Sequence, residues 1–358
     1  MQNIRRLAVF KLRNIGDVLM ITPFLRALRD TFPAARITAV VNSGTEAMLA
    51  HNPHVDEVLA YPRPDGTRGR LARLRDEIRF AAELRRRRFD LTIGLTDGQR
   101  TAWYSWLCAA PLRYGMVKRP EYRPRAYTHP MLFPGPGLHE ADFAFDVLGR
   151  AGFKLRETGP RDLCLVVPED LRAWARAEFA PWRPARIVHV HPVSRWLWKC
   201  WSPAAMAEVI DWLQTERHAH VVVTTGPAPR ELEMAREIVR RCRTAPRFFP
   251  GDLSLSQIAA LSAESDGYFG VDTAPMHMAA AVGVPVIALF GPTYPQTWGP
   301  RTPHATVLSK PCACNAAGSP QCDWNCTRAC LAAISVAEAQ AALDALLALP
   351  KIEPAPVA

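Results

Sequence analysis

The stretch GVDTAPMHMAAAVGVPVIALFGPT, residues 270–293, contains the pattern that decides the fold. Residues 267–272 predict a buried strand, Thr273–Val282 predicts a helix, and the β-branched run 284–291 predicts a second strand. Gly283 separates that helix from the second strand. A strand, a helix and a strand in this order are typical of a βαβ unit, whose strands are parallel and whose helix covers the sheet.

The same alternation occurs in both halves of the chain. In the first half we expect strands at 5–12, 36–42, 55–61 and 90–95, and helices at Val18–Phe32, 69–88 and 141–153. In the second half we expect further strands at 186–192 and 220–226, and helices at Pro203–Arg217, Arg230–Arg243 and Leu255–Ala263. The fold class is therefore α/β, with two Rossmann-like doubly wound domains and an interdomain ligand cleft at the carboxyl ends of the strands.

Composition shifts suggest where these domains end. We assign the first domain to 1–165 and the second to 185–334, followed by a C-terminal helix and tail at 335–358. Prolines punctuate the chain over 160–184, so we expect 166–184 to be a linker. Residues 113–140 are rich in Pro, Gly and Arg and predict a long surface loop.

No part of the sequence predicts secretion or a membrane span. The first residues, MQNIRRLAVFKLRNIGD, lack the long apolar segment of a signal peptide. The longest apolar run lies near 278–290, and Gly283 and Pro285 interrupt it. We therefore expect a cytoplasmic protein.

Positive charge is concentrated in the first half. Residues 1–150 hold 24 Lys and Arg against 15 Asp and Glu, a net charge of +9, whereas 151–358 hold 20 against 19, a net charge of +1. A basic half indicates an anionic partner: nucleic acid, an anionic membrane surface or a phosphorylated substrate. The alternative is a solvated basic surface that serves solubility.

The opening stretch also carries a candidate anion site. Asp272 ends the strand and Thr273 opens the helix, so either side chain can cap the free amides of the first turn. A helix amino terminus favours phosphate, and His277 can add a hydrogen-bond donor one turn later. The alternative is a capped helix with a solvated histidine.

Two more strand ends offer polar groups. HPVSRWLWKCW, residues 191–201, combines Ser194, Arg195 and Lys199 with three tryptophans, which suits a nucleotide or a packed Trp cluster. TTGPAPRELEMA, residues 224–235, places Glu231 where it can accept hydrogen bonds from a ribose or act as a first-turn helix acid. All these segments follow strands and therefore belong to one sheet edge.

In the first half, KLRNIGDVLMITPFLRAL, residues 11–28, places Asp17 at a helix start. Gly16 permits a tight turn before that helix. An ionised carboxylate beside an acceptor hydroxyl can act as a general base. The alternative is a helix-capping Asp.

Together, NIGDVLMITPFLRALRDTFP, HPVSRWLWKCW, TTGPAPRE and VDTAPMHMAAAVGVPVIALFGPT resemble glycosyltransferase family 9, the lipopolysaccharide core heptosyltransferases. The RWLWKCW form is most similar to the heptosyltransferase III subgroup. The resemblance covers nearly the whole chain and implies the GT-B fold. It also implies inverting transfer of heptose from ADP-heptose to a hydroxyl of a lipid-linked core oligosaccharide, without metal or other cofactor.

The resemblance assigns roles to individual residues. Asp17 falls at the general base of the family and Lys199 at its diphosphate-contacting lysine, while Asp272, Thr273 and His277 fall on the nucleotide-sugar motif. Ser194 and Glu231 belong to the same donor site. Ala274 stands where relatives often have Gly, which places a backbone contact there in doubt.

The anionic acceptor suits the basic half. We expect Gly16, Arg119, Arg123 and Arg125 to contact it. The basic helix at 69–88 either rests on the anionic face of the inner membrane or is a solvated surface. We accordingly expect a cytoplasmic protein that is peripheral to that membrane.

Other readings remain open. A GT-B enzyme that uses a different nucleotide sugar, whether a transferase or a sugar epimerase, fits the same pattern, as does a non-catalytic nucleotide-sugar-binding member of the family. No nucleic-acid-binding motif supports a nucleic-acid partner. The segment 312–330 holds five cysteines that predict packed thiols, a structural metal or disulfides: Cys312, Cys314, Cys322, Cys326 and Cys330.

Overall fold

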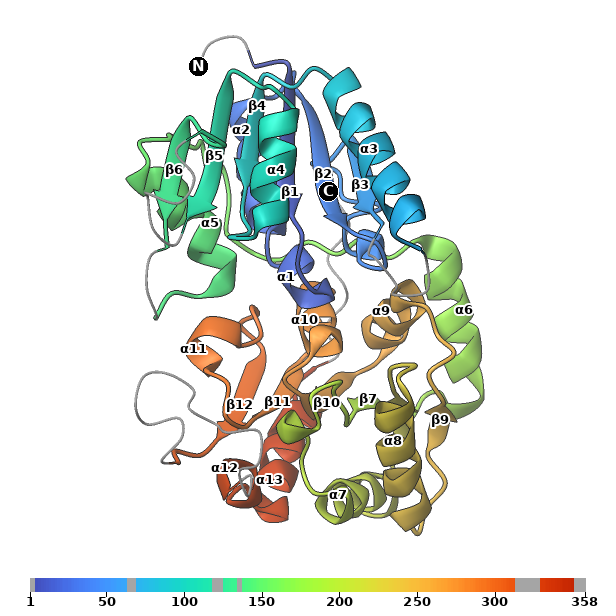
Figure 1. Cartoon of the computed structure of the whole chain (residues 1–358). Helices are drawn as coiled ribbons and strands as arrows, with labels where there is room; N and C mark the ends of the chain where they lie inside the picture. The colour runs from blue at the N-terminus through green and yellow to red at the C-terminus, as the bar shows by residue number, and fades with distance from the viewer. Residues whose placement is uncertain (1–3, 63–68, 118–124, 134–136, 313–328, 351–358) are drawn as a thin grey trace. The chain divides into compact units, whose positions relative to one another are not determined.

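The computed structural model describes residues 4–62, 69–117, 125–133, 137–312 and 329–350 (Figure 1). The described residues form two compact units, which divide between Leu165 and Val166. Within these residues, no helix is both long and apolar enough to cross a bilayer.

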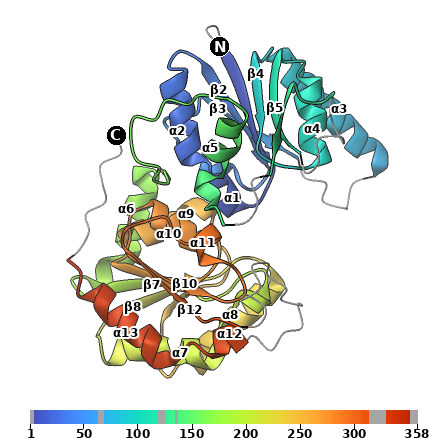
Figure 2. The same cartoon turned by 90° about the vertical axis from the view of Figure 1, so that its left-hand side faces the viewer.

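Unit 1 is a six-stranded parallel sheet with the strand order β3-β2-β1-β4-β5-β6. Helices α2 and α5 cover one face and α3 and α4 cover the other (Figure 2). The strands are β1 (Arg6–Lys11), β2 (Arg36–Asn42), β3 (Glu57–Tyr61), β4 (Leu91–Gly94), β5 (Leu112–Val117) and β6 (His129–Leu132). The helices are α1 (Ile15–Leu19), α2 (Thr22–Thr31), α3 (Arg70–Arg86), α4 (Gln99–Leu107) and α5 (Glu140–Arg150).

Two expectations for unit 1 were wrong. The segment 113–140 is not one long loop, because most of β5 and all of β6 lie within it and extend the sheet. The helix expected at Val18–Phe32 is two helices, α1 and α2, that meet at Met20 and Ile21. Pro23 occupies the first turn of α2, where its missing N–H is tolerated, so the chain restarts a helix there.

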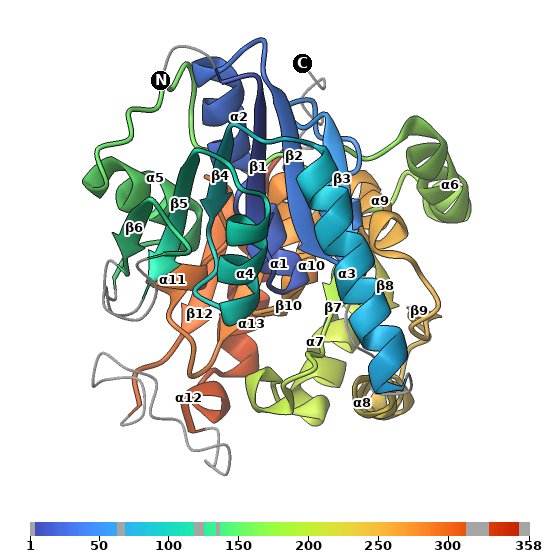
Figure 3. The same ribbon diagram turned by 45° about the horizontal axis from the view of Figure 1, so that its top comes forward.

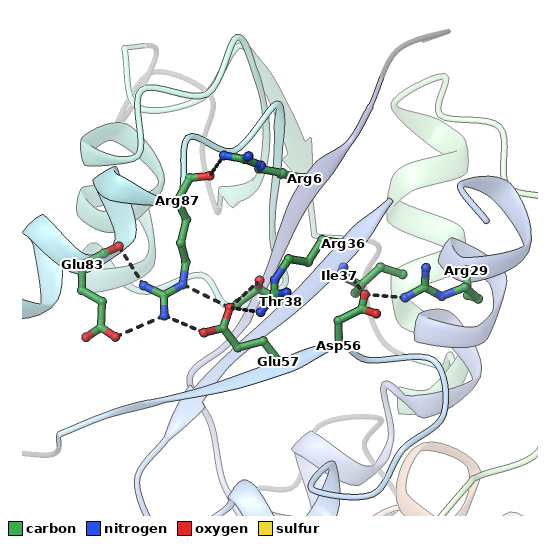
Figure 4. A network of polar contacts seen from close by, with 9 residues as sticks. All are labelled: Arg6, Arg29, Arg36, Ile37, Thr38, Asp56, Glu57, Glu83 and Arg87. Carbon is green, nitrogen blue, oxygen red and sulfur yellow. Dashed lines mark hydrogen bonds and ion pairs between the residues drawn. The ribbon is translucent and has the colours of Figure 1, made fainter. Parts of the chain in front are cut away.

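A polar network ties α3 to the amino ends of β2 and β3 (Figure 4). The Arg87 guanidinium lies 2.6 Å from Glu57 and 3.2 Å from Glu83. The hydrogen bond from Arg87 lowers the pKa of Glu57, although burial opposes the shift. Arg29 makes a similar pair with Asp56 at 2.5 Å. These pairs fix the sheet at the edge opposite to the carboxyl ends of its strands.

Unit 2 is a second six-stranded parallel sheet with the order β12-β11-β10-β7-β8-β9. Helices α7 and α13 lie on one face, and α9 and α10 on the other (Figure 2). The strands are β7 (Ile187–His191), β8 (His220–Thr224), β9 (Arg247–Phe249), β10 (Gly267–Val271), β11 (Val286–Phe290) and β12 (Ala305–Ser309). The helices are α6 (Glu169–Phe179), α7 (Pro203–Thr215), α8 (Pro229–Arg241), α9 (Leu255–Glu264), α10 (Ala274–Ala281), α11 (Pro295–Trp298), α12 (Ala329–Ala332) and α13 (Val336–Leu347).

The segment 166–184, expected as a linker, contains α6 and packs within unit 2. Arg172 and Arg176 of α6 lie 2.8 and 3.3 Å from Glu264 at the end of α9. Ala175 and Phe179 of α6 are buried. The prolines at 160, 168, 181 and 184 flank this helix rather than interrupt it, which is why their spacing suggested a linker.

Both sheets have the same topology. When the strands of each unit are numbered from its own first strand, both orders read 3-2-1-4-5-6, as in dinucleotide-binding folds. The order reverses between β1 and β4 in unit 1, and between β7 and β10 in unit 2. In such sheets ligands bind beside the carboxyl ends of the strands at the point of reversal, so each unit has its candidate binding residues at this edge of its own sheet.

Candidate active site

Three segments meet at the carboxyl edge of the unit 2 sheet. Lys199 follows β7, Asp272 directly follows β10, and Thr293 follows β11. Lys199 Nζ lies 2.6 Å from Asp272 Oδ2, and Thr293 Oγ1 donates a hydrogen bond to the same oxygen at 2.6 Å. The Lys199 and Asp272 side chains are only 11% and 5% exposed. The structure thus brings together two residues that the sequence singled out.

Thr293 is the third member of this cluster, and the sequence reasoning missed it. The signal that points to it is its position, because it ends the opening stretch just beyond the carboxyl end of β11. A hydroxyl at that place can reach the neighbouring strand end, where Asp272 lies. Thr293 therefore orients the carboxylate that holds Lys199.

Two indole rings flank the Lys199 ammonium. Lys199 Nζ lies 5.1 Å from the ring centre of Trp196 and 5.5 Å from that of Trp198. Trp201 packs in the core of unit 2 instead. The three tryptophans are therefore divided between the core and the surface of unit 2. Trp196 and Trp198 lie close to the Lys199 ammonium, and together the cation and the two rings can bind a ligand that has both an anionic group and an apolar ring.

Helix α10 begins immediately after Asp272. The Thr273 side chain makes no capping hydrogen bond, and the Asp272 carboxylate is engaged by Lys199 and Thr293. The expectation that either residue caps α10 was therefore wrong. The amino end of the helix keeps its partial positive charge near Lys199. His277, one turn along, is buried rather than solvated.

Glu231 lies at the same edge of the sheet, in the first turn of α8. A Cβ atom built on Gly226 would lie 2.7 Å from Glu231 Oε2, so the missing side chain of Gly226 makes room for this carboxylate. Burial raises the pKa of Glu231, whereas Arg195 and the Ala228 N–H lower it. The arrangement provides a buried acceptor group for ligand hydroxyls.

Ser194 shapes the loop that carries Lys199. Its hydroxyl accepts a hydrogen bond from the Trp196 N–H at 3.2 Å, and its own N–H donates to Cys200 Sγ at 3.2 Å. Ser194 is buried beneath the loop. These contacts position the turn formed by residues 194–200.

Two buried histidines of β7 contact the last residue of β8 at this edge of the sheet. Thr224 Oγ1 lies 2.7 Å from His189 Nε2 and 2.8 Å from His191 Nδ1. Ser262 Oγ lies 2.8 Å from His189 Nδ1. Burial lowers the pKa of both histidines to about 3, so both rings are neutral near pH 7. They pair polar side chains of β7 with the end of β8.

In unit 1, Asp17 lies beside the reversal between β1 and β4. Asn14 is the residue before α1, and its N–H donates to Asp17 Oδ2 at 3.2 Å. Asp17 is therefore the third residue of α1 and not its cap, and its side chain is half-buried. Gly16 lies inside α1 rather than in the turn that we expected.

A buried ion pair braces the same strand end. Lys11, the last residue of β1, lies 2.6 Å from Glu140, the first residue of α5, and both side chains are largely shielded from water. The sequence reasoning missed this pair, because its members lie 129 positions apart. It fixes the strand end from which the Asp17 loop departs.

The structure describes only some of the remaining predicted residues. Arg125 is exposed in the turn before β6, while Arg119 and Arg123 lie outside the described residues. Cys312 and Cys330 pack against the core of unit 2, and Cys314, Cys322 and Cys326 also lie outside the described residues. In the described part of the chain, no three His, Cys, Asp or Glu side chains gather as metal ligands.

Comparisons with known proteins identify the family of this chain. The model of glycosyltransferase family 9 (heptosyltransferase) matches residues 78–327. Lipopolysaccharide heptosyltransferase 3 of Escherichia coli strain K12 is 31% identical over 297 residues, which are 81% of this chain and 84% of that protein.

Solved structures show the same fold. A family 9 glycosyl transferase from Veillonella parvula has a TM-score of 0.81 and 26% identity, covering 96% of this chain and 97% of its own. E. coli heptosyltransferase WaaC, solved with ADP, has a TM-score of 0.72 and 18% identity over 95% and 99% of the two chains. The two Rossmann-like units are those of the GT-B fold, and the protein belongs to glycosyltransferase family 9, the heptosyltransferases.

Proposed function

We propose that this enzyme transfers heptose from ADP-heptose to a hydroxyl of the lipopolysaccharide inner core, with inversion and without a metal ion. The substrate class follows the relatives: the E. coli protein that is 31% identical is a lipopolysaccharide heptosyltransferase, and WaaC was solved with ADP. The observation that carries the proposal is the cation at the reversal point of unit 2, Lys199 beside Asp272 and the start of α10.

The donor occupies the carboxyl edge of unit 2. The Lys199 ammonium binds the diphosphate at the amino end of α10, and the partial positive charge of that helix end adds to the charge of the ammonium. His277 provides a further donor on the same helix. Glu231 accepts hydrogen bonds from the ribose hydroxyls, and Trp196 and Trp198 present flat surfaces to the rest of the nucleotide.

The acceptor binds at the carboxyl edge of unit 1, where Asp17 lies. The acceptor oxygen bonds to the anomeric carbon of heptose while the bond from that carbon to the diphosphate oxygen breaks. The hydroxyl proton passes to Asp17, and the electron pair of the broken bond leaves with ADP. One displacement inverts the anomeric centre. Positive groups that hold the diphosphate stabilise the charge that develops on ADP.

The basic half of the chain suits this acceptor. Arg119, Arg123 and Arg125 contact core phosphates, because guanidinium groups bind phosphate through paired hydrogen bonds. The enzyme acts in the cytoplasm, at the surface of the inner membrane that holds the lipid-linked acceptor.

Titration calorimetry with ADP, UDP and GDP, with and without EDTA, tests the donor site. We expect ADP to bind best, EDTA to change nothing, and Lys199→Ala to weaken binding by roughly 10–150-fold, as for one lost hydrogen bond between charged groups. Arg241→Ala, on the exposed side of α8, is the control. A preference for UDP or GDP would leave the fold assignment unchanged but would exclude ADP-heptose as the donor.

Asp17→Asn tests the base. We expect the transfer rate to fall by roughly 10²–10⁴-fold while ADP affinity stays unchanged, because the base acts on the acceptor hydroxyl alone. Asp97→Asn is the matched control, since Asp97 is a second carboxylate at the same edge, paired with Arg13 at 2.8 Å. Equal loss in both variants would remove Asp17 from the role of base.

A further inference from the structure

Two helices of unit 1 expose large apolar side chains on their outer sides. Helices α3 and α4 lie side by side on one face of the sheet (Figures 1 and 3). Their outer residues Leu71, Leu74, Ile78, Trp103 and Trp106 are 49–84% exposed, and they are five of the eight most exposed large apolar side chains among the described residues. We call these five the α3–α4 face. Such clustering on one surface of a soluble protein marks an interaction site.

The exposed side of α3 is not needed for the core. Phe80 and Leu84 point inward and pack against the sheet. Glu77, also on the inner side, bonds with Tyr61 and Tyr104. Leu71, Leu74 and Ile78 follow the i, i+3, i+7 spacing of a second apolar stripe on the opposite side. The helix therefore has one apolar side for folding and another that faces outward.

Arginines border this second stripe on one side. At 3.6 residues per turn, Arg75, Arg79 and Arg86 form a row next to the stripe, and all three are exposed. On the other side α3 adjoins α4, because Arg85 Nη1 donates to the Leu107 carbonyl at 3.2 Å. Across the surface the order is the tryptophans of α4, the stripe of α3 and the arginine row.

This order fits the interface of an anionic bilayer. Trp side chains favour the headgroup level of a membrane, and aliphatic side chains of an amphipathic helix enter the acyl boundary. Each Arg near an anionic leaflet adds electrostatic attraction.

We propose that the α3–α4 face docks this protein onto a membrane surface that contains anionic phospholipid. Trp103, Trp106 and the stripe of α3 enter the interface, and Arg75, Arg79 and Arg86 contact lipid phosphates. Helix α3 is the next helix after β3 and α4 the next after β4, and both connect parallel strands, so their first turns lie at the edge of unit 1 that holds Asp17. This last step rests on the proposed function: docking through the α3–α4 face keeps the edge with Asp17 beside a lipid-linked acceptor.

Co-sedimentation of the full chain with vesicles tests the docking without any substrate. We expect binding to phosphatidylcholine vesicles that contain phosphatidylglycerol, little binding to pure phosphatidylcholine, and weaker binding at high salt. Trp103→Ala with Trp106→Ala should weaken binding by roughly tenfold or more, because both rings lose their interfacial burial. Arg75→Glu with Arg79→Glu should abolish the preference for anionic vesicles.

Leu132→Ala with Phe133→Ala is the matched control, since these side chains are equally exposed elsewhere in unit 1. That variant should bind vesicles like the native chain. Equal loss in the control and in the Trp variant, or no vesicle binding at all, would overturn the proposal. So would a dimer of the native chain that the Trp variant loses, because the face would then bind a second copy.

Transfer activity separates this proposal from the proposed function. The Trp variant should transfer heptose to lipid-free core oligosaccharide at the native rate, and lose activity only on acceptor embedded in vesicles. If the native chain binds anionic vesicles but transfers to neither acceptor, the docking stands and the proposed function fails.

Discussion

Replacing Lys199 by Met should destabilise unit 2 as well as weaken donor binding. The substitution removes the ammonium 2.6 Å from Asp272 and leaves a carboxylate that is only 5% exposed. Met keeps most of the side-chain volume between Trp196 and Trp198. The loss of stability in this variant therefore measures the charge interaction and not the cost of a cavity.

The size of the effect follows from burial and from what remains. Breaking a buried ion pair by removing one partner costs about 3–5 kcal/mol, because the other charge stays buried without compensation. Here Thr293 still donates a hydrogen bond to Asp272, and Lys199 is partly accessible to water. We therefore expect a loss of about 2–3 kcal/mol in the free energy of unfolding of unit 2.

Hydrogen exchange of β7 and β10 peptides, read by mass spectrometry, measures this loss within unit 2 alone. Asp272→Asn and the double variant complete a thermodynamic cycle, in which we expect a coupling energy of about 1.5 kcal/mol or more. Arg241→Met breaks an exposed pair with Glu237 in the same unit and should cost no more than about 0.5 kcal/mol. Additive effects of Lys199→Met and Asp272→Asn would refute the buried pair.

Two further predictions concern unit 2. Burial holds the pKa of His189 and His191 near 3, so below pH 6.5 the unfolded state binds protons that the folded state does not. The free energy of unfolding should thus fall as the pH drops from 6.5 towards 3, by up to about 1.4 kcal/mol per pH unit for each histidine. Urea unfolding at several pH values measures this dependence, and His191→Asn should make the free energy of unfolding depend less steeply on pH. An unchanged pH dependence in that variant would contradict the reasoning. Gly226→Ala places a Cβ atom against Glu231 Oε2 and should weaken ADP binding by roughly tenfold. Calorimetry checks this, and native affinity would show that Glu231 does not contact the nucleotide.

The repeating alternation in the sequence predicted both sheets, because buried parallel strands form continuous apolar runs. Strand β2 has the bounds that the sequence predicted, and the helix after Asp272 lies where the opening stretch placed it. Rossmann topology then puts Lys199 and Asp272 at one edge. Their direct pairing did not follow from sequence, since it depends on how two segments 73 positions apart fold together.

The elements that the sequence reasoning missed have physical reasons in common. Strands β5, β6 and β9 are edge or near-edge strands with Arg, His or Pro among their residues, which interrupt the apolar run. Helix α4 carries Trp103 and Trp106 on its outer side, so its exposed face looks apolar and masks the helical period. Long-range pairs such as Lys11 with Glu140 leave no local signal.

Transfer itself tests the central claim most directly. The purified chain is incubated with ADP-heptose and a heptose-deficient core oligosaccharide in EDTA, and mass spectrometry follows the acceptor while ADP release is measured in parallel. The account predicts one added heptose per acceptor, one ADP per transfer, inverted linkage, and loss of both products in Asp17→Asn. Release of ADP without a modified acceptor, or no reaction while ADP binds normally, would contradict it.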